Sequence, residues 1–164
     1  MFRRASWILL GLSCGLAGMA RETDHTWIRG VFTGKSPRAV TLAETDAWQR
    51  ASTCAEHAPN SFVLVGTGQS MQPLYAPGTI LVMQQCAYDK LQPGQTALYR
   101  NQAGKVVAHV LVTKARDGWR ATGLNNREHD MEPVVVKNFV GVVVAAFTPL
   151  REIRAARVAL AGRP

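Results

Sequence analysis

Residues 61–85 read SFVLVGTGQSMQPLYAPGTILVMQQ, which is two apolar runs joined by a segment that contains glycine, serine and proline. Both runs contain several β-branched residues, which favour strands, and the Pro77-Gly78 pair before the second run is a turn signal. Ser70 lies in the connection and is followed by a methionine. A turn that ends a strand either presents such a serine as a nucleophile or holds it as an ordinary turn residue.

Similar apolar runs continue towards the C-terminus at regular spacing. Turn signals such as Pro-Gly separate them, a pattern typical of antiparallel sheets rather than of alternating strands and helices. The expected strands lie in the runs SFVLVG, TILVMQQ, QTALYR, KVVAHVLVT, GWRATG and PVVVKNFVGVVVAAF. We therefore predict a mainly β fold, with an antiparallel β-domain over residues 61–147 and one or two short helices.

The segment before this domain, residues 25–60, is interpreted as a linker and a short helix. Residues 29–40 contain Gly, Ser and Pro without a clear period, as in a linker or an irregular first strand. In the run TLAETDAWQRAS, Thr41 precedes Glu44 by three residues, which predicts a capping box at the start of a helix. The helix is expected to end before Pro59, because proline cannot continue it.

The N-terminal residues indicate export from the cytosol. Arg3 and Arg4 precede the apolar run SWILLGLSCGLAGMA, which ends in small residues. This pattern of charge and length predicts a signal peptide or a short N-terminal membrane anchor over residues 1–24. Either interpretation places the rest of the chain outside the cytosol, as a membrane-associated or periplasmic protein.

Positive charge is spread along the chain rather than gathered in one stripe. The formal net charge is +8 over 164 residues, and aromatic residues make up 7%. Because no basic stripe is interleaved with aromatic residues, a nucleic-acid partner is not expected. The tail over residues 148–164 carries four arginines and one glutamate. It is predicted to be helical, as a solvated surface helix or as a contact with an anionic membrane.

The cysteines and histidines do not form a metal-binding pattern. Of the three cysteines, Cys14 lies in the predicted leader, which leaves Cys54 and Cys86 either paired or free in an exported protein. No Cys-x-x-Cys or His-x-x-x-His spacing occurs in the sequence. No metal and no cofactor are therefore predicted.

One of the expected strands carries a histidine at its centre. In the run KVVAHVLVT, a period of two places alternate residues on opposite faces. One face is wholly apolar, and the other is mixed, with His109 between Val107 and Leu111. His109 is therefore either a buried histidine hydrogen-bonded to the backbone or a general base, since imidazole accepts protons near neutral pH.

The loop TGLNNREHD at residues 122–130 brings an acidic residue one hairpin later. Glycine and two asparagines favour a turn, and Asp130 at its end could accept a hydrogen bond from a histidine and fix the tautomer of its ring. The alternative is a solvated turn. His129 competes for any role given to His109, but its polar surroundings favour a surface position.

The order of these features resembles the signal peptidase I family. Ser70-Met71-Gln72-Pro73 ends a strand, a later strand carries the central His109, and a Gly-x-Asn-Asn loop precedes Asp130. The resemblance is to the serine/histidine branch found in the endoplasmic reticulum, in archaea and in some bacteria, and it covers about residues 61–147. Most bacterial members, and the related self-cleaving SOS repressors, have a lysine where this chain has His109. The fold implied is the antiparallel β-domain of these peptidases.

Carried over by position, the resemblance implies a catalytic site. Ser70 would be the nucleophile, His109 the base and Asp130 the residue that orients the base. The Ser70 backbone N–H would face the oxyanion. The residues implied to contact the substrate are Met71, Gly68 and Gln69.

Two positions depart from the family pattern. Many members have a serine where this chain has Gly68, and its hydroxyl contributes to the oxyanion hole. The family loop usually reads Gly-Asp-Asn, whereas this chain has Gly123-Leu124-Asn125. The departure at Gly68 removes one oxyanion donor from the implied site.

The resemblance also implies a substrate and an activity. The substrate would be an extended polypeptide, a preprotein leader at a membrane surface, that lies alongside sheet edges with small side chains in shallow pockets. The runs FVLVGTGQ and TILVMQ are the edges expected to receive it. The expected function is that of a serine endopeptidase that removes leader or signal segments from exported proteins. The alternatives are a maturation peptidase for one pilin-like or secretion-system substrate, and a non-catalytic or self-cleaving β-domain of the same fold.

Overall fold

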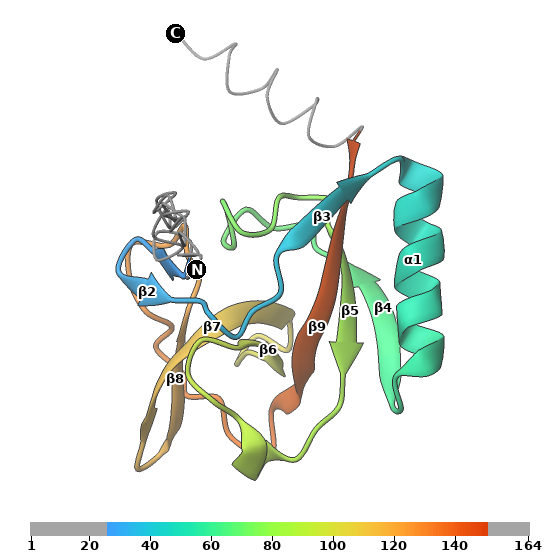
Figure 1. Cartoon of the computed structure of the whole chain (residues 1–164). Coiled ribbons are helices and arrows are strands. Elements are labelled where there is room, and N and C mark those ends of the chain that lie inside the picture. The colour runs from blue at the N-terminus through green and yellow to red at the C-terminus, as the bar shows by residue number, and fades with distance from the viewer. Residues whose placement is uncertain (1–25, 151–164) are drawn as a thin grey trace, which may run out of the picture.

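The main sheet has seven strands, and its long last strand β9 (Phe139–Pro149) lies between the two halves of the sheet (Figure 1). The computed structural model describes residues 26–150. On one edge, β9 pairs with β5, and β5 pairs with β4. On the other edge, β9 pairs with β6, which is followed by β7 and then β8. The C-terminal end of β9 also pairs with β3. The other strands of this sheet are β3 (Ala39–Leu42), β4 (Ser61–Val65), β5 (Ile80–Gln84), β6 (Thr96–Arg100), β7 (Val106–Ala115) and β8 (Gly118–Thr122).

The predicted fold class is confirmed, because the protein is mainly β and its strands from β4 to β9 pair antiparallel. Within the described residues, its helices are α1 (Glu44–His57) and the short 3-10 helix η2 (Tyr88–Lys90). Each expected run contains a strand. In the last run, however, the strand begins only at Phe139, and the residues before it are not part of a strand. Residues 133–138 form an irregular segment, in which Val134 makes an isolated bridge with Trp119. The Asn138 side chain accepts a hydrogen bond from the Val135 N–H at 2.7 Å and so closes a turn before β9.

The predicted helix is confirmed, but its predicted N-terminal cap is wrong. Helix α1 begins at Glu44 and ends before Pro59. Thr41 does not cap it, because Thr41 lies in β3 and pairs with Thr148 of β9 in a parallel ladder. The residue before the helix is Ala43, which makes no side-chain cap hydrogen bond. Pairing with β9 gives this segment several backbone hydrogen bonds, whereas a single capping side chain would stabilise the helix by only about 1 kcal/mol. The strand pairing is therefore favoured over the cap.

Part of the segment predicted as a linker or an irregular first strand forms strands. Strands β1 (Trp27–Ile28) and β2 (Val31–Phe32) make an antiparallel hairpin, and β3 joins the main sheet. The hairpin turns at Arg29-Gly30, whose φ angles are 49° and 78°. Two-residue turns with positive φ suit the twist of paired strands, but arginine is an unusual residue there, so the sequence carries little signal for this turn. Residues 39–57 therefore belong to the same folded unit as the domain predicted over 61–147.

Helix α1 covers one face of the sheet over β4, β5 and β9 (Figure 1). Its contact face includes Ala47 and Ala51, which are fully buried and lie four residues apart on the same side of the helix. These small side chains let the helix approach the strands closely. They pack against Ile80, Val82 and Phe147.

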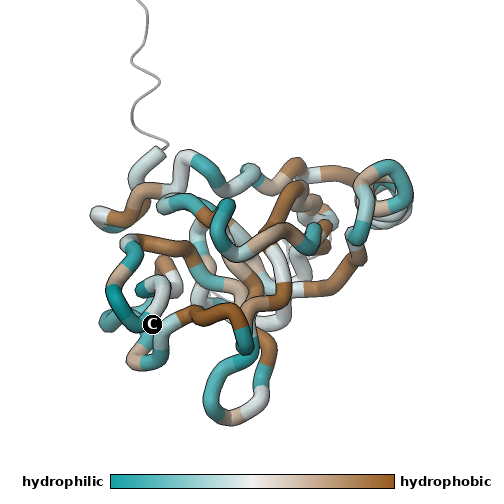
Figure 2. Tube along the Cα trace, turned by 90° about the horizontal axis from the view of Figure 1, so that it is seen from below, coloured by the Kyte–Doolittle hydropathy of each residue, from teal (hydrophilic) through white to brown (hydrophobic). Residues whose placement is uncertain are grey.

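Two further apolar clusters form because alternate residues of a strand face opposite sides. Leu98 of β6 belongs to the cluster that includes Met71. The next residue, Tyr99, belongs to the cluster that includes Trp119. Figure 2 shows hydrophobic residues along the strands and hydrophilic residues on many of the connecting loops.

The predicted leader over residues 1–24 lies outside the described residues, and so does most of the tail predicted over residues 148–164. The first two residues of that tail belong to the sheet, since β9 runs to Pro149. Within residues 26–150, no helix combines the length and the hydropathy needed to cross a membrane. Cys54 and Cys86 are both free thiols in the structure.

Candidate active site

Ser70 lies in the connection between β4 and β5, and hydrogen bonds hold this connection in place. At its base, the Gly78 N–H donates to the Gly66 carbonyl at 2.7 Å. Just after Ser70, the side chains of Met71 and Tyr75 are buried in the core. The Tyr75 hydroxyl also donates to a backbone carbonyl of the N-terminal segment at 2.7 Å. These contacts on both sides fix the backbone that presents Ser70.

His109 lies on β7, directly opposite Ala97 of β6, and its side chain is buried. Its Nε2 lies 3.0 Å from Ser70 Oγ, and its Nδ1 lies 2.7 Å from Asp130 Oδ2. The histidine is thus buried, as one interpretation of the sequence expected. Its hydrogen-bond partners, however, are the side chains of a serine and an acid rather than the backbone.

Asp130 comes from the loop that follows β8. Its backbone N–H donates to the Ala121 carbonyl at 3.0 Å, which holds this part of the loop against β8. Its carboxylate accepts hydrogen bonds from His109 Nδ1 at 2.7 Å and from the Tyr99 hydroxyl at 2.5 Å. When Nδ1–H donates to the carboxylate, the Nε2 lone pair faces the Ser70 hydroxyl. This is the arrangement that lets an imidazole accept a proton from serine.

Tyr99 is a residue of the site that sequence reasoning missed. Burial raises the pKa of Tyr99 well above its usual range, and the hydrogen bond to the Asp130 carboxylate raises it further. The hydroxyl therefore keeps its proton and acts as a donor. In the sequence, Tyr99 is one more strand residue of the run QTALYR. Its place beside Asp130 depends on how β6 pairs with β7, which no local pattern reveals.

The loop over residues 123–126 holds Ser70 from its other side. The Asn125 N–H donates to the Ser70 carbonyl at 2.7 Å, and a Cβ placed on Gly123 would lie 2.9 Å from the Ser70 Cβ. The Arg29 guanidinium, at the turn of the β1–β2 hairpin, donates to Asn125 Oδ1 at 2.9 Å. The Gly-x-Asn-Asn motif therefore does more than lead to Asp130, because it also supports the backbone of Ser70.

A cleft of about 500 Å³ opens beside Ser70. Its walls come from β4, from the turn that leads to Ser70, and from residues 105–108 at the start of β7. Both strands have an unpaired edge among the described residues, since β4 pairs with β5 alone and β7 pairs with β8 only from Val110 onward. A segment of extended chain placed in the cleft would therefore meet free backbone groups on both walls.

The residues predicted to contact a substrate are only partly brought together. Met71 and Gly68 line the cleft, whereas Gln69 is exposed and lies outside its lining. At Gly68, an added Cβ would have only Ser70 Oγ within 4 Å, at 3.9 Å, so this position has room for a side chain. His129 is exposed in its loop, in the surface position that its polar neighbours favoured.

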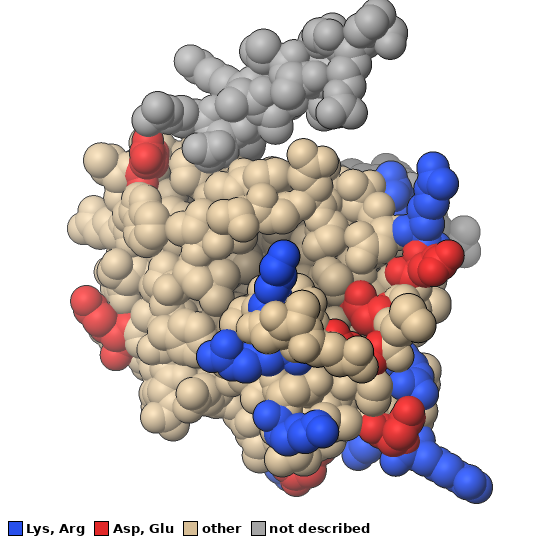
Figure 3. All heavy atoms as spheres, turned by 180° about the vertical axis from the view of Figure 1, so that it is seen from behind, with Lys and Arg blue, Asp and Glu red and all other residues tan. Residues whose placement is uncertain are grey.

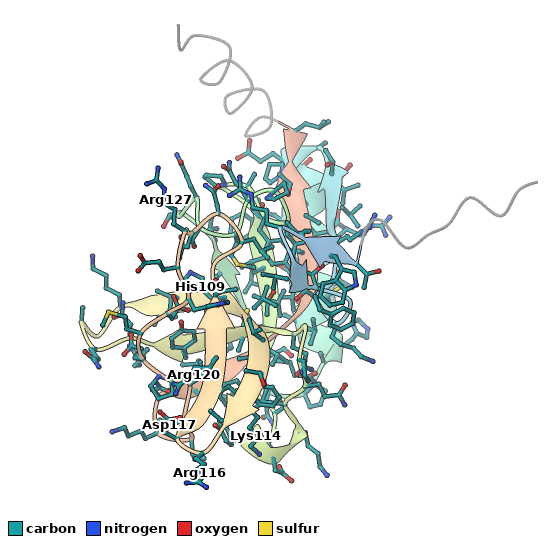
Figure 4. The ribbon with its side chains drawn as sticks, turned by 90° about the vertical axis from the view of Figure 1, so that its left-hand side faces the viewer. His109, Lys114, Arg116, Asp117, Arg120 and Arg127 are labelled. Carbon is teal, nitrogen blue, oxygen red and sulfur yellow. The ribbon has the colours of Figure 1, made fainter. Side chains whose placement is uncertain are left out.

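Two lysines lie in or beside β7, at very different places relative to Ser70. Lys114 lies 6.0 Å from the centre of the Tyr88 ring. Figure 4 shows Lys114 in the lower part of the ribbon, near Arg116 and below His109. Lys105, by contrast, lines the cleft beside Ser70. Lys105 is therefore the lysine to test as an alternative base to His109.

Acidic and basic side chains are mixed on one face of the protein. On the face seen in Figure 3, basic and acidic side chains are interspersed along the lower and right-hand parts. Within residues 26–150, no group of three or more His, Cys, Asp or Glu side chains could hold a metal ion.

A scan against protein-family models finds no match for this chain, and a search of curated proteins finds no similar sequence. Function is therefore inferred from the site and from the motifs of the sequence. A serine, a histidine and an acid joined by hydrogen bonds can act as nucleophile, base and orienting group in acyl transfer.

Replacing Gly123 by alanine is expected to displace Ser70. The added methyl group would lie 2.7 Å from the Asn126 side-chain nitrogen, which can rotate, and 2.9 Å from the Ser70 Cβ, which is attached directly to the backbone and cannot rotate away. We expect the free energy of unfolding, measured by chemical denaturation, to fall by about 1–3 kcal/mol. The matched control is Gly66→Ala, because a Cβ there would meet nothing closer than 3.6 Å. Equal losses in the two variants would contradict a specific close contact at Gly123.

Proposed function

We propose that the protein is a serine endopeptidase that cleaves leader or signal segments from exported proteins. The observation that carries the proposal is the row of hydrogen bonds from Ser70 Oγ through His109 to Asp130, with distances of 3.0 and 2.7 Å, beside the cleft. A serine hydroxyl is a weak nucleophile until a base takes its proton, and the base needs a partner that holds it. The same three residues are the ones that the resemblance to the serine/histidine branch of the signal peptidase I family selects.

In the proposed mechanism, Ser70 Oγ attacks the carbonyl carbon of the scissile bond while His109 Nε2 takes the hydroxyl proton. Asp130 stabilises the imidazolium that forms, and the Ser70 backbone N–H faces the negative oxygen of the tetrahedral intermediate. His109 then gives its proton to the leaving amine, which leaves an acyl ester on Ser70. Water attacks this ester, again with His109 as the base, and the Ser70 hydroxyl is restored.

The cleft favours an extended polypeptide as the substrate. Its walls belong to β4 and to the start of β7, and within residues 26–150 both strands have free edges that can pair with an added strand. Val65 and Val106, one on each wall, are 40% and 45% exposed. They offer apolar surface to the side chains of a bound peptide. The resemblance adds that small side chains such as alanine are preferred at the cleaved bond and two residues before it.

The proposed place of action is outside the cytosol, at or near a membrane. This part of the proposal rests on the sequence of residues 1–24 and on the resemblance, since preprotein cleavage sites emerge on that side of the membrane. The narrower alternative is a maturation peptidase for one pilin-like or secretion-system substrate. It would use the same three residues, so the range of accepted substrates separates the two functions.

The direct test is to incubate the full-length protein and its Ser70→Ala variant with a panel of secreted preproteins. The cleaved bonds are mapped by mass spectrometry. We expect only the wild type to cleave, and to cleave after small residues, because the variant cannot form the acyl ester. The control is Ser52→Ala, which changes an exposed serine of α1 and should keep full activity. Cleavage of a single preprotein would favour the narrower alternative, and unchanged processing by Ser70→Ala would exclude Ser70 as the nucleophile.

A pH profile separates a histidine base from a lysine base. The base must be neutral to accept the Ser70 proton, and an ordinary imidazole titrates near ~6.5, whereas an ordinary lysine titrates near ~10.4. Because the protonated form of either base is inactive, a histidine base should give a kcat/KM that has already levelled off at pH values where a lysine base is still gaining activity. His109→Ala should abolish cleavage, and His129→Ala and Lys114→Ala should retain most of it.

Lys105 needs its own measurement, because it lines the cleft. Lys105→Ala is expected to keep the shape of the pH profile, even if KM changes. An activity that climbs steadily past about pH 9, or complete loss of activity in either lysine variant, would show that a lysine is the base.

Position 68 offers a gain-of-function test. Gly68→Ser should fold normally, since the added Cβ would have only Ser70 Oγ within 4 Å, at 3.9 Å. It would restore the hydroxyl that many members of the family place next to the oxyanion. We expect kcat to rise about tenfold, which is part of the hundredfold or more that a preorganised donor contributes. Gly68→Ala is the matched control and should give no rise, and an equal rise in both variants would contradict a role for the hydroxyl.

A further inference from the structure

Tyr99 lies where the sheet meets the loop that carries Asp130. On β6, Tyr99 pairs with Val107 of β7, while Ala97 pairs with His109. Residues that pair directly share a face of the sheet, and so do residues two apart along a strand. Tyr99 is therefore the diagonal neighbour of His109, and the centroids of the two rings are 6.3 Å apart at an interplanar angle of 71°.

The Tyr99 hydroxyl donates to the same carboxylate oxygen that accepts from the histidine. It lies 2.5 Å from Asp130 Oδ2, and His109 Nδ1 lies 2.7 Å from that oxygen. Its distance to His109 Nδ1 itself is 3.5 Å, which is a much weaker contact. Hydrogen bonds to a carboxylate are roughly twice as strong as those between neutral groups. The tyrosine therefore acts on the histidine mainly through Asp130.

The tyrosine is held far more firmly than the acid. Asp130 follows an irregular loop whose residues 125–129 are exposed. In the described part of the chain, the side chains bonded to its carboxylate are those of Tyr99 and His109. Tyr99, by contrast, is 1% exposed and lies in a strand that pairs with β7 on one edge and with β9 on the other. The hydroxyl of Tyr99 thus connects an acid on a loop to the centre of the sheet.

We propose that Tyr99 is a positioning residue of the site, whose hydroxyl holds the Asp130 carboxylate towards His109 Nδ1 and so keeps the proton of the neutral ring on Nδ1. Its effect on rate rests on the proposed peptidase function, but its effect on the His109 ring does not. Without the hydroxyl, the carboxylate can turn away or bind water instead. The tautomer with its proton on Nε2 then becomes populated, and this tautomer cannot accept the Ser70 proton.

The test variant is Tyr99→Phe, which removes the hydroxyl and keeps the ring. The 13C and 15N shifts of the His109 ring report which nitrogen carries the proton, and they can be measured without substrate. At about pH 9, where an ordinary imidazole is neutral, we expect the Nδ1–H tautomer in the wild type and a mixture of both tautomers in the variant. His109→Gln assigns the resonances. With a peptide substrate, we expect kcat to fall about tenfold at unchanged KM, because Tyr99 acts through Asp130 rather than on the substrate.

The matched control is Tyr88→Phe. The Tyr88 hydroxyl donates to the Val134 carbonyl at 2.8 Å, so this variant loses one tyrosine hydrogen bond of similar length that does not involve the triad. It should keep the His109 shifts and the kcat of the wild type. Unchanged His109 shifts in Tyr99→Phe, or equal changes in both variants, would overturn the proposal. A wild-type protein that cleaves no peptide would refute the peptidase function instead, and the ring shifts would still decide the role of Tyr99.

Discussion

The site depends on the pairing of β9 with both halves of the main sheet. On one edge, β5 brings β4 and the turn that carries Ser70, and on the other edge, β6 brings β7 with His109 and β8 before Asp130. In the hydrogen-bonded order of the sheet, β9 is the strand that links the two halves. The distance between the serine hydroxyl and the imidazole therefore depends on how β9 holds β5 relative to β6, together with the contacts that the loop over residues 123–126 makes with Ser70.

The pairing of β9 is irregular on both of its edges. Its register shifts between Leu98 and Tyr99 of β6 and again between Val82 and Met83 of β5. Such bulges bend a strand and increase its twist. Gly141 makes the close approach of the β5 end possible, since a Cβ there would lie 2.7 Å from the Gln84 carbonyl oxygen. With β9 between them in the sheet, β4 and the start of β7 line the same cleft.

The polar side chains of the site are compatible with their apolar surroundings because they bond to one another. A buried polar group costs free energy unless it finds a hydrogen-bond partner. Asp130 accepts hydrogen bonds from both His109 and Tyr99. On the cleft side, the other ring nitrogen of His109 is hydrogen-bonded to Ser70 Oγ. A network of this kind has few alternative arrangements, so the burial that makes it costly to break also keeps its geometry constant. In the proposed peptidase, this constancy is what lets the same histidine accept and return a proton.

The sequence by itself determined the local elements and the candidate residues. Apolar runs bounded by turn signals specified the strands, and the ordered motifs around Ser70, His109 and Asp130 selected three side chains that the structure brings together. The sequence-based prediction was wrong where a distant segment competes with a local signal. Thr41 has the spacing to Glu44 that is typical of a helix cap, but it pairs with β9 instead. The sequence carried no signal where the partner is distant in the chain, as for Tyr99, which donates a hydrogen bond to Asp130, 31 positions away. Only the tertiary structure decided these contacts, because local patterns depend on neighbouring residues, whereas strand register depends on which distant edges meet once the chain is folded.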